Sequence, residues 1–168
     1  WRGRTSQSTL EFNSNYVVKD NSIINVNDIV DVRVKRRQST AMYVITFANP
    51  KGGSGKTTSA MLLAEQIAIS GGRVAILDLD PNANILAWAQ TREAEGRDVP
   101  FTVHARPQAE ETVELIDSLS DEADYLIIDL EGSKDQIVTF ALSRTDLCII
   151  PLDGSPMEAR QAAQAVRL

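Results

Sequence analysis

The chain has 168 residues, of which 43% are apolar and 24% are charged, and its formal net charge at pH 7 is −6. This composition suits one globular domain with a hydrophobic core. The single cysteine, Cys148, excludes a disulfide framework and a cysteine metal cluster, and no apolar stretch reaches membrane-spanning length. We therefore expect a cytoplasmic protein without a membrane anchor or a signal peptide.

The N-terminal segment, residues 1–41, differs from the rest of the chain. It holds five of the eight asparagines and carries a net charge of +3, which leaves −9 for residues 42–168. One interpretation is a non-native leader, with Met42 as the start of the native domain. The other is a basic arm that binds nucleic acid. The basic cluster of such an arm would comprise Arg33, Lys35, Arg36 and Arg37.

A phosphate-binding loop is predicted at residues 51–58, which read Lys-Gly-Gly-Ser-Gly-Lys-Thr-Thr. The apolar run 42–48 predicts a buried strand that enters this loop, and residues 57–69 predict a helix that leaves it. The N-terminus of that helix would therefore point at a bound anion.

Each residue type in the loop has a chemical reason to be there. Glycines allow backbone angles that direct successive N–H groups at phosphate oxygens. Lys56 would place a charge at the β- and γ-phosphates, and the Thr57 hydroxyl would ligate Mg²⁺. ATP and Mg²⁺ are the expected ligands. The expected nucleotide-binding residues are Lys51, Gly52, Gly53, Ser54, Gly55, Lys56, Thr57 and Thr58.

After the loop, strand and helix signals alternate with short connections, which predicts a mostly parallel sheet with helices on both faces. Further strands are predicted at 73–79, 100–104, 124–129 and 146–152, and helices at 84–95, 107–119, 134–143 and 156–168. Gly71-Gly72 and Gly96 are expected to end two helices, and Asn84 to cap the N-terminus of one. Right-handed crossovers bring the loops after the strands to one edge of the sheet.

Two acidic motifs fall at that edge. The run 125–129 ends in Asp129, as in a Walker B element, where a carboxylate holds the Mg²⁺ shell through water. The run 76–81 ends in Asp78-Leu79-Asp80-Pro81, and a carboxylate there can accept a proton from water near the γ-phosphate. The structural alternatives are a cap of the following turn for Asp129 and a turn-initiating role for Asp80.

The loop departs from the general P-loop pattern at two positions. Pro50 stands where glycine is usual, and Lys51 adds a second lysine. These features resemble the deviant Walker A ATPases of the ParA/MinD family. The resemblance implies an α/β P-loop NTPase fold and a homodimer that closes on ATP, in which Lys51 reaches the phosphates of the partner.

The resemblance also implies roles for the acidic residues. Asp80 would orient the attacking water, and Asp78 would support the metal site or the switch loop. Lys51, Lys56 and Asp80 are thus the catalytic candidates, and Thr57, Asp129 and Asp78 the candidates for the metal site. Asn82 stands where the family usually has glutamine, which leaves its role open.

The stretch after Asp129 departs further from the partition ATPases, which usually continue with Thr-Pro-Pro. Leu130-Glu131-Gly132-Ser133 resembles a conjugation-associated branch akin to VirC-type accessory ATPases. Gly132 can serve a switch that senses the γ-phosphate. Glu131 is either a charge beside the metal shell or a solvated loop residue. Weaker candidates in a later loop are Asp153 and Ser155.

The expected activity is slow, partner-stimulated ATP hydrolysis in plasmid or chromosome partition or in conjugative DNA processing. Non-specific DNA and a ParB-like protein are the partners that the resemblance implies. It also suggests that the chain corresponds to the N-terminal two-thirds of such an ATPase. The alternatives are a metal-cluster-assembly or other metabolic ATPase, and a nucleotide-gated scaffold with little hydrolysis.

Three further residues favour structural interpretations. His104, the only histidine, has no neighbouring cysteine or histidine with which to form a metal site. Trp88 lies beside apolar residues of a predicted helix, which indicates packing. Cys148 lies in an apolar run, which indicates a buried structural thiol.

Overall fold

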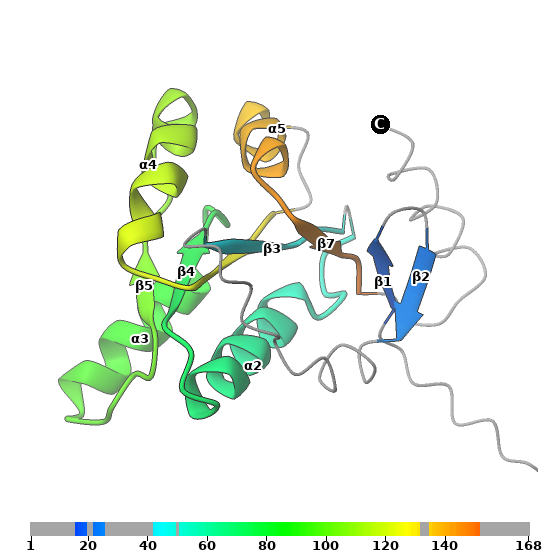
Figure 1. The fold of residues 1–168 in the computed structure, drawn as a ribbon. Coiled ribbons are helices and arrows are strands. Elements are labelled where there is room, and N and C mark those ends of the chain that lie inside the picture. The colour runs from blue at the N-terminus through cyan, green and yellow to red at the C-terminus, as the bar shows by residue number, and fades with distance from the viewer. Residues whose placement is uncertain (1–15, 20–21, 26–41, 50, 132–134, 152–168) are drawn as a thin grey trace, which may run out of the picture.

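The computed structural model describes residues 16–19, 22–25, 42–49, 51–131 and 135–151. These residues form one seven-stranded sheet flanked by helices (Figure 1). The strands are β1 (Tyr16–Lys19), β2 (Ser22–Asn25), β3 (Tyr43–Phe47), β4 (Val74–Asp78), β5 (Thr102–His104), β6 (Tyr125–Asp129) and β7 (Leu147–Ile149). The helices are α2 (Lys56–Ile69), α3 (Asn84–Ala94), α4 (Thr112–Ser118) and α5 (Gln136–Ser143).

The strand order is β2-β1-β7-β3-β6-β4-β5, and the five strands from β7 to β5 are parallel. The central strand β3 pairs with β6 along its whole length, from Tyr43 opposite Tyr125 to Phe47 opposite Asp129. Because parallel strands share one direction, the ends of β3, β4 and β6 lie next to each other at one edge. The predicted α/β fold with a mostly parallel sheet is confirmed.

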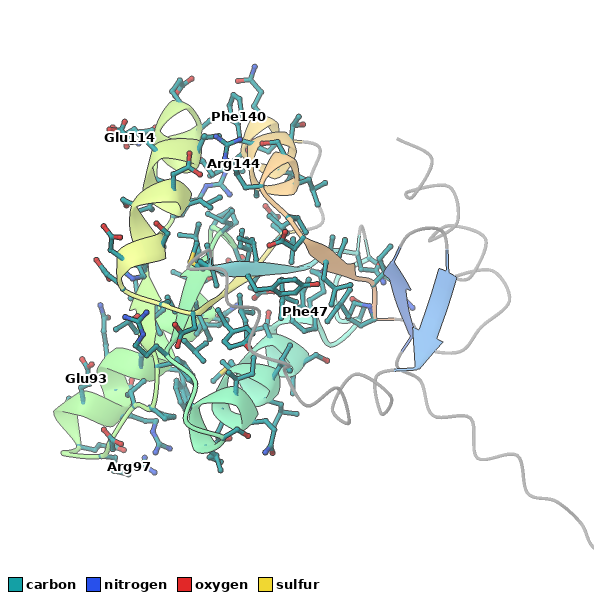
Figure 2. All side chains as sticks on the ribbon, in the orientation of Figure 1. Phe47, Glu93, Arg97, Glu114, Phe140 and Arg144 are labelled. Carbon is teal, nitrogen blue, oxygen red and sulfur yellow. The ribbon has the colours of Figure 1, made fainter. Side chains whose placement is uncertain are left out.

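Helices cover both faces of this sheet. Alternate strand residues point to opposite faces, so the core divides into two layers. Ile45, Phe47 and Ile127 belong to the layer that also contains residues of α2 and α3. Val44 and Leu126 belong to the layer that contains residues of α4 and α5. Figure 2 shows Phe47 between β3 and α2, and Figure 1 shows α4 and α5 on the other side of the sheet.

Glycines end α2 and α3 as predicted. Gly71 has φ 84°, and the N–H groups of Gly71 and Gly72 donate to the carbonyls of Ala68 and Ile67, at 2.9 and 3.1 Å. This pair of bonds is a Schellman motif. Gly96 ends α3 with φ 68° in the same arrangement.

The predicted N-cap of α3 is wrong. Asn84 is the first helical residue, and the capping position belongs to Ala83, whose φ is 48°. No side chain at that position caps the helix. The N–H groups of Ile85 and Leu86 donate to the Asp78 carboxylate instead, at 3.0 and 3.1 Å. The carboxylate of Asp78, at the end of β4, thus caps α3 in place of a side chain at the N-cap position.

The remaining elements follow the predictions with shifts at their ends. The predicted helix at 107–119 begins with a 3-10 turn, Ala109–Glu111, before α4, and a second turn, Leu119–Asp121, follows it. At the start of the first turn, the Gln108 N–H donates to the Glu111 carboxylate at 3.4 Å. The predicted helix at 156–168 lies outside the described residues.

The first two strands lie in the N-terminal segment. β1 pairs antiparallel with β2 and with β7, where Val17 is opposite Ile149. Whether residues 1–41 belong to the native protein, and whether the ATPase domain comprises 42–168, stay predictions.

Candidate active site

A cavity of about 610 Å³ lies at the edge of the sheet where the parallel strands end. The phosphate loop forms one side of it, and the loops after β4 and β6 contribute the rest. Its lining residues are Gly52, Gly53, Ser54, Gly55, Lys56, Thr57, Thr58, Asp80, Asn82, Asn84 and Glu131. The structure thus brings together most of the residues that the sequence singles out.

The phosphate loop takes the backbone shape that its glycines permit. Gly53 and Gly55 have φ of 74° and 84°, in the left-handed region where a side chain would be strained. A Cβ built on Gly52, Gly53 or Gly55 meets no atom within 4 Å, so the loop backbone borders open space. Gly55 is also the N-cap residue of α2, which directs that helix N-terminus at the cavity.

The two lysines of the loop have different surroundings. Lys56 is 8% exposed, and its Nζ donates to the Lys51 carbonyl at 3.3 Å across the loop. Lys51 itself is exposed at the loop mouth. A buried ammonium is positioned to serve this chain's own cavity, whereas an exposed one is accessible from outside it.

Thr57 and Asp129 meet at the base of the cavity. The Thr57 hydroxyl donates to Asp129 Oδ2 at 2.7 Å. Asp129 is 1% exposed, and its Oδ1 finds no hydrogen-bond partner among the described residues. Burial raises the pKa of Asp129 to about 6, against the hydrogen bond from Thr57, which lowers it.

This donor set fits Mg²⁺. A buried carboxylate with an unpaired oxygen beside a hydroxyl supplies the hard oxygen ligands that Mg²⁺ prefers, with water completing the shell. Across the described ranges, no group of three or more His, Cys, Asp or Glu side chains is placed to hold a metal by itself.

Asp78 lies behind the cavity rather than in its lining. It is 1% exposed, and besides its two bonds to α3 it accepts the Asp80 N–H at 3.3 Å. Burial raises its pKa, and the three backbone N–H groups act against that rise. The side chain therefore holds the loop between β4 and α3. That Asp78 supports the metal site or a switch loop stays a prediction.

Asp80 lies at the cavity wall. Its Oδ1 accepts the backbone N–H and the side-chain Nδ2 of Asn82, both at 2.8 Å. The turn-forming role and the position facing the cavity thus coexist. Glu131 lines the cavity as well. Gly132, Asp153 and Ser155 lie outside the described residues.

Asn49 is a site residue that the sequence analysis missed. It is 7% exposed, donates to the Pro151 carbonyl at 2.6 Å, and accepts the Lys51 N–H at 2.9 Å. Asn49 therefore ties the start of the phosphate loop to the chain after β7. The only signal in the sequence was an asparagine between an apolar run and the glycine-rich loop, where a buried amide would need hydrogen-bond partners.

Trp88 and His104 agree with their structural interpretations, whereas Cys148 is not fully buried as predicted. Trp88 stacks on Phe101 with ring centroids 5.9 Å apart. Cys148 is half-buried, and burial raises its pKa to about 11. His104 lies 3.8 Å from the Glu122 carboxylate. Among the described residues no helix is long and apolar enough to cross a membrane.

Comparison with known proteins identifies relatives of this chain. Residues 43–161 match the family described as "ATPase MipZ". "Protein ParA" of Rhizobium radiobacter is 34% identical over 129 residues, which are 76% of this chain and 56% of that protein. "Protein virC1" of Rhizobium rhizogenes is 28% identical over 131 residues, 75% of this chain and 55% of that protein. The chain spans about half the length of these curated relatives.

Solved structures share the fold. A plasmid partition protein of Borrelia burgdorferi B31, bound to AMPPNP, superposes with a TM-score of 0.63 at 21% identity, over 76% of this chain and 69% of that one. The pNOB8 ParA bound to nonspecific DNA gives 0.60 at 18%, over 74% and 58%. A Mycobacterium smegmatis cobyrinic acid a,c-diamide synthase with an ATP analogue and magnesium gives 0.61 at 22%, over 75% and 66%.

The family match covers more than half of the chain, and both its fold and its loop with Lys51 and Lys56 agree with that match. The chain belongs to the MipZ/ParA family of ATPases, of the ParA/MinD type with a deviant Walker A loop.

Proposed function

We propose that this protein is a Mg²⁺- and ATP-dependent switch that dimerises on ATP, hydrolyses it slowly and resets. The observation that carries the proposal is the contact between Thr57 and Asp129 beside the glycine-lined cavity. A hydroxyl and a buried carboxylate in contact, next to a buried lysine, form the constellation that phosphoryl transfer requires.

The residues divide the work by charge. Lys56 and the loop N–H groups bind the phosphates of this chain's nucleotide. Thr57 and Asp129 would hold Mg²⁺, which neutralises charge on the phosphate oxygens when bound. Asp80, at the cavity wall, orients the attacking water and accepts its proton. Catalysis is then positioning and charge neutralisation, without a covalent intermediate on the protein.

Dimerisation rests on Lys51. Its side chain is exposed at the loop mouth, whereas Lys56 is buried within the loop. We propose that Lys51 contacts the phosphates bound by a second copy, so that ATP joins the two copies.

The cellular role that we propose is partition of plasmids or chromosomes, or the processing of DNA during conjugation. The relatives named ParA and virC1 support these two roles respectively, and the structure described as ParA bound to nonspecific DNA supports DNA as a ligand. A partner that stimulates hydrolysis, ParB-like in partition systems, belongs to this proposal, as does a nucleoid-associated location.

A metabolic ATPase is the second candidate. The similarity to cobyrinic acid a,c-diamide synthase supports it, because that synthase has the same fold as this chain and is a biosynthetic enzyme. DNA should leave the turnover of such an enzyme unchanged.

Nucleotide-dependent dimerisation tests the proposal. We expect light scattering to show dimers of the full-length protein with Mg²⁺ and AMPPNP, and monomers with ADP. Lys51→Ala should still bind nucleotide but stay monomeric. Lys56→Ala, as the matched control, should lose nucleotide binding itself. Dimers of Lys51→Ala, or a wild-type protein that binds no nucleotide, would refute the proposal.

A further inference from the structure

One arginine outside the phosphate loop joins the loop after β4 to the N-terminus of α5. Arg106 follows β5, the strand at the end of the parallel sheet. Its Nη1 donates to the Leu79 carbonyl at 2.6 Å, and its Nη2 donates to the Asp135 carboxylate. The guanidinium, which follows β5, thus joins the residue after β4 to the N-terminus of α5.

The contact with Leu79 fixes the residue directly before Asp80. Leu79 is fully buried, and its N–H donates to the Asp129 carbonyl at 3.0 Å. Both backbone groups of Leu79 are therefore hydrogen-bonded: the N–H to the end of β6 and the carbonyl to Arg106, which follows β5. Arg106 is thus hydrogen-bonded to the backbone of the residue next to Asp80.

The Asp135 carboxylate binds Arg106 and does not cap α5. Asp135 is the N-cap residue of α5 and has the extended backbone of a capping residue, yet its side chain caps no helix N–H. Aspartate at this position normally accepts such a bond. Its carboxylate faces Arg106 instead, at the end of the connection that begins after Asp129.

We infer that Arg106 is a positioning residue that couples the Asp80 loop to the N-terminus of α5, so that Asp80 keeps one position at the cavity wall. This inference rests on the proposed ATPase function and adds a residue to it. The planar guanidinium suits this task because it offers several fixed donors, so it can bind a carbonyl and a carboxylate together.

The chain offers a matched control. Arg73 also donates to a backbone carbonyl, that of Asp121 at 3.2 Å, and to a carboxylate, that of Asp124 at 2.9 Å. It precedes β4 and therefore lies at the opposite edge of the sheet from the cavity. A variant at Arg73 removes the same kind of bridge without touching the site.

Steady-state turnover by the full-length protein tests the inference. We expect Arg106→Gln to lower kcat about tenfold, the effect of a displaced catalytic group, with KM for ATP within about twofold of wild type. Arg106→Lys should recover only part of the loss, because an ammonium cannot hold both partners in a fixed fork. Arg73→Gln should leave kcat unchanged.

Two further readouts separate positioning from general stability. Asp135→Asn combined with Arg106→Gln should lower kcat no more than Arg106→Gln alone, since both act on one bridge. Hydrogen exchange should quicken at Leu79–Asn84 in Arg106→Gln and stay unchanged there in Arg73→Gln.

An active wild type with an equally active Arg106→Gln would overturn this inference alone. So would an equal loss of kcat in Arg73→Gln. A wild-type protein that hydrolyses no ATP would overturn the proposed function, and this inference with it.

Discussion

Replacing Asp129 by asparagine should stabilise the metal-free protein while it removes Mg²⁺-dependent function. The Asp129 carboxylate is 1% exposed, and its Oδ1 has no hydrogen-bond partner in the described part of the chain. Burial of such a group in its charged form lowers the stability of the folded state unless a cation neutralises the charge. Asparagine has nearly the same shape and can still accept the hydrogen bond from Thr57 through its amide oxygen.

The raised pKa of Asp129 sets the size of the expected change in the free energy of unfolding. Burial lifts the pKa of Asp129 from 3.8 to about 6. Each tenfold change in proton affinity corresponds to about 1.4 kcal/mol, so the charged carboxylate destabilises the folded state by at most about 3 kcal/mol. The asparagine Nδ2 would replace the unpaired oxygen and itself cost about 1 kcal/mol or more. We therefore expect a net gain of about 1–2 kcal/mol at pH 8.

The gain should depend on pH with a defined sign. Because the folded pKa lies above the unfolded one, the folded state binds the proton more tightly. The stability that this proton provides is complete below about pH 4 and is lost as the pH rises through about 6. The advantage of Asp129→Asn should thus be largest at pH 8 and shrink as the pH falls toward 4.

Urea unfolding in EDTA at pH 8 and at lower pH measures this difference. Asp80→Asn is a suitable control, since Asp80 lines the same cavity but is only half-buried. Added Mg²⁺ and ATP should raise the wild-type midpoint and leave that of Asp129→Asn almost unchanged. Lower stability of Asp129→Asn than of wild type at pH 8 without metal would show that the charged Asp129 carboxylate does not destabilise the folded state.

Three further predictions concern the residues around the cavity. Asp78→Ala should lower the free energy of unfolding by about 1–3 kcal/mol, because it leaves the first N–H groups of α3 unpaired, and an unchanged urea midpoint would contradict this. Lys56→Ala should abolish binding of a fluorescent ATP analogue while the circular dichroism spectrum stays native, whereas retained binding would move the phosphates away from this loop. Asn49→Ala should weaken analogue binding and cost about 1–3 kcal/mol, because the Pro151 carbonyl and the Lys51 N–H both lose a partner, and equal affinity would show that the tie is dispensable.

The phosphate loop and the sheet could be predicted because their signals are local. The sequence from Lys51 to Thr58 determines its own shape through glycine and a helix N-terminus, and apolar runs of strand length alternate with helices. The neighbouring positions of Thr57 and Asp129 also followed, since parallel strands end at one edge.

Contacts between distant residues could not be predicted in this way. Asn49 and Pro151 are 102 positions apart, and Arg106 and Asp135 are 29 apart, with no motif connecting either pair. The prediction of the N-cap of α3 was wrong for a related reason. Asn84 has the right residue type but lies one position after the cap, and the buried Asp78 accepts the N–H groups of Ile85 and Leu86 instead.

ATP turnover by the full-length protein, with and without double-stranded DNA, decides between a partition-type switch and the other candidates. We expect slow turnover that requires Mg²⁺, rises when DNA is added, and is lost in Asp80→Ala while nucleotide binding remains. Turnover that is indifferent to DNA would contradict a partition-type switch and favour a metabolic ATPase. Nucleotide bound tightly but not cleaved would contradict hydrolysis and leave a nucleotide-gated scaffold.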